Sequence, residues 1–392
     1  MLEWTIAYYA HSHAVRLFDT LCFFDGVEKL NRIPISRPIV TKEMTEAAAN
    51  ALASERLVMG ESVFKFEEEF ARYIGTDHAV SVSSGTDALI LAMIALEVRG
   101  RDVLTTPFSF VATATSIVHA GGTPRFADVS GDDHNIDPLA IKANVRENTC
   151  GIMPVDIFGY PARMDEIAEA AGPNTKIIED ACQAHGASYK GKKCGSFSDA
   201  GCFSFYPTKN MTVGGDGGMV TTNDERLAND LRKLRDCGRV SRYEHDVFGF
   251  TSRLNTANAA FGRVQLRHLD EWNERRRAIA RRYASNLKDV DGIGLPPMGS
   301  KDVTPVFHLF AIRCDDRDEL ASHLASRGID TAVHYPIPIH LQPTYRNAYG
   351  YEGGEFPISE QLSKQMLSLP MFPEMTNEQV DRVCEAINEH YA

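Results

Sequence analysis

The chain has 392 residues, of which 43% are hydrophobic and 24% charged, and this length and composition predict an ordinary globular protein of two domains. Its 53 acidic residues outnumber 41 basic ones, which disfavours a nucleic-acid partner because such binding depends on neutralised phosphates. No apolar run reaches the ~18 residues of a membrane-spanning helix, and the eight cysteines include no C-x-x-C pair. We therefore expect a cytoplasmic protein with reduced thiols, no membrane contact and no metal site.

Residues 1–32 do not share the pattern of the rest of the chain. Their apolar pieces are interrupted by Glu3, Arg16 and Asp19, and the basic start of a secretory signal is missing. We expect this segment to be an N-terminal extension outside the main fold.

From Ile33 onward the chain alternates between helical and strand patterns. Helices are predicted at 41–54, 62–74, 87–96, 111–120, 138–145 and 164–171, and strands at 78–82, 102–105, 123–128, 150–155 and 176–179. This alternation is typical of an α/β fold with a mostly parallel sheet covered by helices. We place this large domain at residues 33–265, and we expect its ligand beyond the carboxyl ends of the strands.

The pattern changes in the last third of the chain. A long charged helix is predicted at 265–287, followed by a Gly/Pro-rich break at 291–300. A strand at 306–312, a helix at 316–327, a strand at 329–334, a Pro-rich loop and two more helices follow. We interpret residues 266–392 as a smaller C-terminal α+β domain.

Three segments that follow predicted strands have the residue types of a binding site. In Ser83-Ser84-Gly85-Thr86-Asp87 a glycine turn leads into a helix, whose first amides and positive dipole end bind phosphate. Asp180 directly follows the apolar strand that ends at Glu179, where a carboxylate could keep a pyridine ring protonated. Lys209 follows a short apolar strand and precedes a glycine cluster, and a lysine in a confined site can attack an aldehyde. Each segment alone has an ordinary structural explanation, but their order suits a cofactor that combines these groups.

The same segments resemble a known family. The stretches SSGTDAL, PFSFVATA, EDACQAHGA, FSFYPTKN, GGDGGMV and HYPIPIHLQP are similar to those of the DegT/DnrJ/StrS sugar aminotransferases, which depend on pyridoxal 5′-phosphate (PLP). The resemblance runs from about Ile33 to the C-terminus. It implies fold type I of the PLP-dependent enzymes and a homodimer with shared active sites.

The resemblance also implies roles for individual residues. Lys209 would form the Schiff base and move protons, and Asp180 would pair with the ring nitrogen. Gln183 would lie near the phenolic oxygen of the cofactor and Phe110 would stack on its ring. The phosphate would be held by Ser84, Gly85, Thr86 and Ser204.

One position departs from the family pattern. The family has G-Y-N-[SF]-R before the long helix, and its Asn reaches the phosphate across the dimer interface. This chain has Gly249-Phe250-Thr251-Ser252-Arg253 instead. We expect Thr251 to serve the partner's phosphate, with Asn255 or Asn258 as substitutes.

The substrate contacts are less clear from the sequence. The candidates are His185, His308, His334, Tyr335 and His340. The resemblance implies transfer of an amino group from glutamate or glutamine to a 3- or 4-keto group of a nucleotide-linked sugar. The alternatives are a PLP-dependent sugar dehydratase of the same fold, in which a histidine replaces the lysine, and a non-catalytic PLP-binding regulatory protein.

Overall fold

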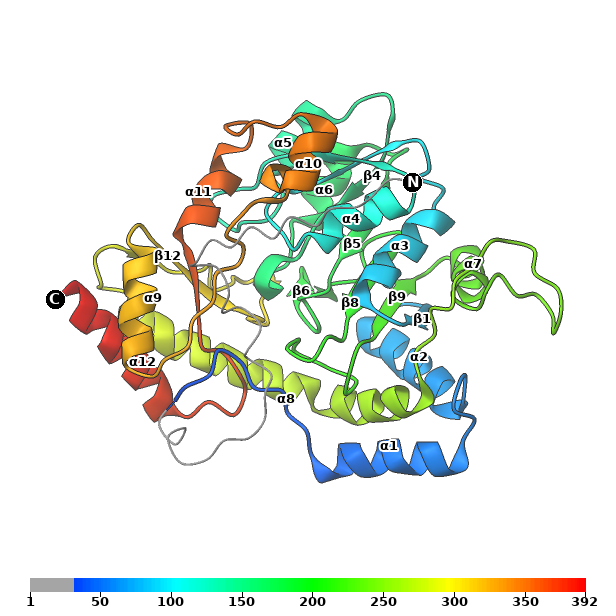
Figure 1. Ribbon diagram of the computed structural model, residues 1–392, viewed down its shortest axis with the longest axis horizontal. Coiled ribbons are helices and arrows are strands. Elements are labelled where there is room, and N and C mark those ends of the chain that lie inside the picture. The colour runs from blue at the N-terminus through cyan, green and yellow to red at the C-terminus, as the bar shows by residue number, and fades with distance from the viewer. Residues whose placement is uncertain (1–31) are drawn as a thin grey trace, which may run out of the picture. The chain divides into compact units, whose positions relative to one another are not determined.

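The computed structural model describes residues 32–392, so the extension predicted for residues 1–32 lies, apart from Arg32, outside the described residues. Helices and strands alternate along the first two thirds of the described chain (Figure 1). Among residues 32–392, no helix is both long enough and apolar enough to cross a membrane.

The main sheet has seven strands in the order β1-β9-β8-β5-β4-β2-β3. Their bounds are β1 His78–Val82, β2 Asp102–Thr105, β3 Thr123–Phe126, β4 Thr149–Met153, β5 Lys176–Asp180, β8 Ala200–Ser204 and β9 Gly218–Thr222. Strands β8, β5, β4, β2 and β3 run parallel to one another, and β9 is antiparallel to both of its neighbours, β8 and β1. The prediction of a mostly parallel sheet is therefore confirmed.

Helices cover both faces of this sheet. Helices α3 (Gly85–Ala95), α4 (Ala112–His119) and α7 (Glu225–Arg235) share one hydrophobic cluster with Val80, Val103 and Val220. On the opposite face lie α2 (Glu61–Ile74), α5 (Pro138–Asn144), α6 (Met164–Ala171) and the first half of α8 (Thr256–Leu287). Because successive strand residues point to opposite faces, strands buried on both sides read as continuous apolar runs. Helix α1 (Lys42–Ser54) packs outside this layer, against α8 (Figure 1).

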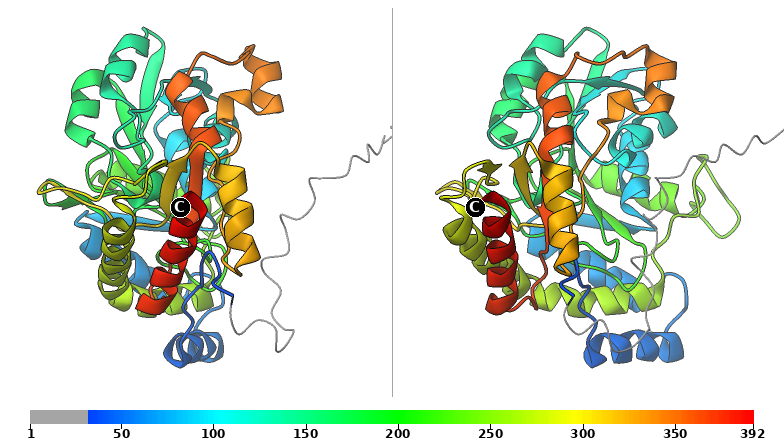
Figure 2. Two further views of the ribbon diagram at one scale, coloured as in Figure 1. Left: turned by 90° about the vertical axis from the view of Figure 1, so that its left-hand side faces the viewer. Right: turned by 60° about the vertical axis from the view of Figure 1, so that its left-hand side comes forward.

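A second core forms in the C-terminal part of the chain. Its three-stranded antiparallel sheet contains β10 (Ile293–Gly294), β12 (Phe310–Cys314) and β13 (Met366–Leu369). Helix α12 (Asn377–Tyr391) lies between α8 and α9 (Arg317–Ser326) in both views of Figure 2. Together these elements bury Tyr283, Phe310 and Phe372 in one cluster.

The remaining elements are short. Helix α10 (Pro343–Tyr349) packs back onto α4 and β3, where the Tyr345 hydroxyl lies 2.9 Å from Thr115 Oγ1. The other short elements are α11 Pro357–Gln365, the 3-10 turns η2 Ile157–Gly159 and η3 Ile339–Leu341, and a small sheet of β6 Ser188–Tyr189, β7 Lys192–Lys193 and β11 Val303–Thr304.

Several predictions for the C-terminal part were wrong in detail. The long helix starts at Thr256 rather than at residue 265, so the proposed domain boundary at 265/266 falls inside α8. The segment 329–334 is not a strand, because it makes only single bridges, from Ile329 to Ile33 and from Ala332 to Ser368, before it turns away. Strand β13 was missed, and three helices follow the Pro-rich loop region instead of two. The division into a large and a small domain stays a prediction.

Candidate active site

The carboxyl ends of β1, β5 and β8 border a cavity of about 450 Å³. Its walls include most of the residues that the sequence predicted for cofactor and substrate. These are Ser84, Gly85, Thr86, Phe110, Asp180, Gln183, Ser204, Lys209, His308, His334 and Tyr335. The predicted residues outside these walls are Thr251, His185 and His340.

The turn between β1 and α3 supplies donors for an anion. Ser84 is the N-cap of α3, and its Oγ accepts a hydrogen bond of 3.0 Å from the amide of Asp87. The first amides of a helix, here those of Gly85 and Thr86, have no partner inside the helix. A Cβ on Gly85 would lie 2.5 Å from Cβ of Ser204, so only glycine lets this turn approach the end of β8. The geometry fits a phosphate group.

A residue from a distant segment supports this turn. Ser252 Oγ donates a hydrogen bond of 2.7 Å to the Asp87 carboxylate, and its oxygen lies 3.1 Å from Ser83 Oγ. No sequence pattern indicated this contact, because the two partners are 165 positions apart. Ser252 thus links the segment that precedes α8 to the anion-binding turn.

The Asp180 carboxylate is fixed by two donors. It ends β5 and is only 4% exposed. Thr113 Oγ1 donates to its Oδ2 at 2.8 Å, and the amide of Cys182 donates to its Oδ1 at 3.3 Å. Thr113 Oγ1 in turn lies 2.8 Å from Ser109 Oγ. Ser109 and Thr113 were not predicted, although both belong to the PFSFVATA stretch.

Lys209 lies in the turn after β8 and lines the same cavity. Burial lowers the pKa of its ammonium group, while the nearby Cys182 and Asp180 act in the opposite direction. A lowered pKa increases the fraction of neutral amine, which is the form that attacks an aldehyde.

Gln183 connects two parts of the cavity wall. Its Oε1 accepts a hydrogen bond of 2.7 Å from the amide of Phe158, and its Nε2 donates to the Tyr335 hydroxyl at 3.1 Å. The centres of the Phe110 and Tyr335 rings are 6.2 Å apart. Phe110 is exposed and lines the cavity. Burial raises the pKa of Tyr335, so its phenol stays protonated.

The four histidines divide into two pairs. Burial lowers the pKa of His334 to about 4 and that of His308 well below its ordinary value, and both neutral imidazoles line the cavity. His185 is fully buried against Phe203 and Phe205. His340 is also fully buried, with its Nε2 3.1 Å from the Glu360 carboxylate. The prediction that His185 and His340 contact the substrate does not fit this burial, because neither imidazole reaches the cavity.

Thr251 lies away from this cavity, on an exposed segment after α7. It pairs with Asp236 through a single bridge, and its Oγ1 is 3.3 Å from Cys237 Sγ. Several apolar side chains of this segment are exposed, namely Val240, Tyr243, Val247, Phe248 and Phe250. A role of Thr251 in a partner's site stays a prediction.

The residues present fit PLP. Amides and hydroxyls at the start of α3 suit its phosphate, and the Asp180 carboxylate suits a protonated ring nitrogen. Lys209, which is half-buried and lines the cavity, offers an amine for its aldehyde. His308 Nδ1 has no hydrogen-bond partner within residues 32–392, which leaves a polar group for a ligand.

Comparison with known proteins agrees with this geometry. A model of the DegT/DnrJ/EryC1/StrS aminotransferase family matches residues 38–388. A dTDP-3-amino-3,4,6-trideoxy-alpha-D-glucose transaminase of Streptomyces venezuelae is 43% identical over 349 residues, which are 88% of this chain and 92% of the relative. A pleiotropic regulatory protein of Geobacillus stearothermophilus is 41% identical over 352 residues, which are 89% and 94% of the two chains. The crystal structure of S. venezuelae DesV in complex with a ketimine intermediate has a TM-score of 0.87 at 42% identity, covering 89% of this chain and 94% of that chain.

Proposed function

The chain belongs to the DegT/DnrJ/EryC1/StrS aminotransferase family and is a sugar aminotransferase, and we propose that it works with PLP on Lys209. The proposed reaction moves an amino group from glutamate or glutamine to the 3- or 4-keto group of a nucleotide-linked hexose. The observation that supports this proposal is the meeting of Lys209, Asp180 and the Ser84–Thr86 turn in one cavity.

In this proposal each residue has a limited task. PLP, when bound, supplies an aldehyde that carries the amino group and a ring that withdraws electrons. Lys209 holds the cofactor and moves a proton at its Nζ. Asp180, oriented by Thr113, keeps the ring nitrogen protonated.

Two further groups of residues bind and orient. Ser84, Gly85, Thr86 and Ser204 would hold the phosphate. Gln183 would contact the phenolic oxygen, and Phe110 would cover the ring.

We propose that the sugar contacts His308, His334 and Tyr335. All three are uncharged polar groups at the cavity wall, and such groups suit the hydroxyl and carbonyl groups of a sugar. The name of the S. venezuelae relative, which refers to a dTDP-linked amino sugar, supports a nucleotide-linked substrate.

We also propose that the enzyme is a homodimer in which the segment around Thr251 serves the partner's site. The exposed Tyr243, Phe248 and Phe250 support this, because several exposed apolar side chains in one segment are typical of a protein–protein contact surface.

Covalent labelling tests the proposal. Purified protein incubated with PLP should bind one cofactor per chain, and borohydride reduction followed by peptide mass mapping should find a pyridoxyl group on Lys209. Lys209→Ala should abolish both the label and amino transfer from a panel of amino-sugar nucleotides, while the exposed Lys301→Ala should keep both. A label on another lysine would contradict the assignment, and bound PLP without any amino transfer would favour a regulatory role.

A further inference from the structure

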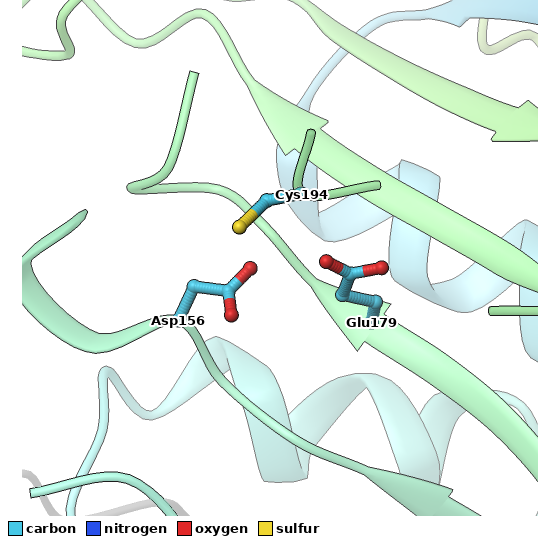
Figure 3. Close-up of side chains that lie close together, drawn as sticks. All are labelled: Asp156, Glu179 and Cys194. Atoms are coloured by element: carbon cyan, nitrogen blue, oxygen red, sulfur yellow. The ribbon is translucent and has the colours of Figure 1, made fainter. Parts of the chain in front are cut away.

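Two carboxyl groups and a thiol lie close together near the carboxyl end of β5, and none of them lines the cavity (Figure 3). They are Asp156, which precedes η2, Glu179 on β5, and Cys194. One carboxyl oxygen of Asp156, one of Glu179 and the Cys194 sulfur all lie within 4.8 Å of one another, and all three side chains are fully buried. Within residues 32–392 neither carboxyl group has a Lys, Arg or His partner, so something other than a basic side chain must offset their charge.

The four carboxyl oxygens have different surroundings. Glu179 Oε1 accepts a hydrogen bond of 2.7 Å from the Gly195 amide, and its Oε2 accepts one of 3.1 Å from Ser198 Oγ. Asp156 Oδ1 accepts from the Ala162 amide at 2.8 Å. Asp156 Oδ2 is buried and makes no hydrogen bond within residues 32–392, although the Cys194 thiol, a weak donor, belongs to the same cluster. The Asp156 carboxyl group points toward Glu179 and Cys194 (Figure 3). An unpartnered buried carboxylate oxygen is costly, whereas the same oxygen carrying a proton becomes a donor.

This asymmetry decides which carboxyl group is the acid. Both oxygens of Glu179 already accept from donors, so Glu179 is suited to be the carboxylate. Burial and the negative charge of Glu179 raise the pKa of Asp156 well above its ordinary value. Burial also raises the pKa of Cys194 far enough to keep the thiol neutral.

We propose that Asp156 is protonated at neutral pH and donates through Oδ2 to the Glu179 carboxylate, and that this pair positions Asp180. Positioning follows from the backbone, because the Asp156 amide donates to the Asp180 carbonyl at 3.2 Å and the Asp180 amide donates to the Pro154 carbonyl at 2.9 Å. Glu179 adds a connection from the adjacent residue of β5 to the loop at Gly195–Ser198. The meaning of this positioning for the reaction rests on the role proposed for Asp180.

The proposal makes opposite predictions for two isosteric substitutions. In Asp156→Asn, the amide oxygen can accept from Ala162 and the amide nitrogen can donate to Glu179, so the hydrogen bonds are kept. In Glu179→Gln, the new nitrogen must face either the Gly195 amide, which can only donate, or the Ser198 hydroxyl, which can accept from it but then loses the acceptor for its own proton. We therefore expect Asp156→Asn to stay folded and Glu179→Gln to be clearly less stable. Asp132→Asn, at an exposed position, is the control.

The pH dependence of the free energy of unfolding shows whether the folded protein keeps the proton assigned to Asp156. An unfolded Asp156 has an ordinary pKa of 3.8 and loses its proton above about pH 4, whereas the folded pair keeps one proton. The unfolded state therefore binds fewer protons, and stability falls as pH rises, until the pH reaches the raised pKa of the folded pair. In this range the ratio of the wild-type unfolding constant to that of Asp156→Asn should increase about tenfold per pH unit.

The experiment is urea unfolding of PLP-free wild type, Asp156→Asn and Asp132→Asn between about pH 5 and pH 8, with PLP affinity measured separately by absorbance. Parallel pH profiles of wild type and Asp156→Asn would overturn the shared proton. One equivalent of a divalent metal, found by mass spectrometry in wild type and lost in Asp156→Asn, would also overturn the shared proton. A cation would then offset the charge of the two carboxyl groups. Asp156→Asn should bind PLP like wild type and Glu179→Gln should bind it at least several-fold more weakly; equal affinities would overturn the positioning. If wild type bound no PLP, the proposed function would fail, while the pH comparison would still decide the proton.

Discussion

The buried ion pair between Glu67 and Arg235 allows a direct test of the contacts that stabilise the elements around the site. Glu67 on α2 and Arg235 at the end of α7 are paired through Oε1 and Nη1, with side-chain exposures of 8% and 2%. Both also bond Ser81 on β1: Arg235 Nη1 donates to its carbonyl at 2.7 Å, and Ser81 Oγ donates to Glu67 at 2.7 Å. The pair thus joins two helices to the strand that leads into the anion-binding turn at Ser84.

Glu67→Gln keeps the shape of the side chain and an acceptor for Ser81 but removes the charge. The guanidinium of Arg235 would remain buried without a counter-ion, which typically costs about 3–5 kcal/mol. The adjacent residue supplies a matched control, because Glu68 pairs with Arg72 at 2.8 Å with both side chains about 70% exposed. Such an exposed pair contributes only about 0–1 kcal/mol, so Glu68→Gln should be nearly silent.

Urea unfolding, followed by circular dichroism, measures both variants under the same conditions. We expect the free energy of unfolding of Glu67→Gln to fall by about 3 kcal/mol or more, and that of Glu68→Gln by less than about 1 kcal/mol. Equal small losses for the two variants would refute the reasoning, since they would mean that Arg235 finds other acceptors or water once Glu67 is neutral.

The remaining predictions concern the cofactor. Asp180→Asn removes the charge that we assign to the ring nitrogen at nearly constant size, so turnover should fall by ~10²-fold or more, the scale of losing a preorganised electrostatic partner; near-normal steady-state rates would mean that another acid serves the ring. Thr251→Val removes a hydroxyl proposed to bond the partner's phosphate, and a hydrogen bond to a charged group is worth roughly 1.5–3 kcal/mol. PLP affinity in a fluorescence titration should then weaken about tenfold or more without loss of the dimer by size-exclusion chromatography, and an unchanged affinity would direct attention to Asn258, which now donates to the Val213 carbonyl.

The sequence by itself determined the fold class and the main parts of the site. Alternating apolar segments with clear helix starts, such as Thr41 before α1, gave strands and helices of the large sheet close to their observed bounds. The sequence also predicted the main site residues. Gly85 follows a strand, Asp180 ends one and Lys209 precedes a glycine cluster, and all three line the same cavity. These signals are local, because each depends on residues within a few positions of one another.

Only the tertiary structure decided contacts between distant segments. The sequence could not show that Thr113 orients Asp180, that Ser252 supports the turn at Ser84, or that Asp156 faces Glu179. The lone histidines show the same limit, since His308 lines the cavity, whereas His185 is buried against Phe203 and Phe205. Whether a side chain is buried, paired or open to a ligand depends on which elements pack around it, and that packing is fixed by long-range contacts rather than by neighbours along the chain.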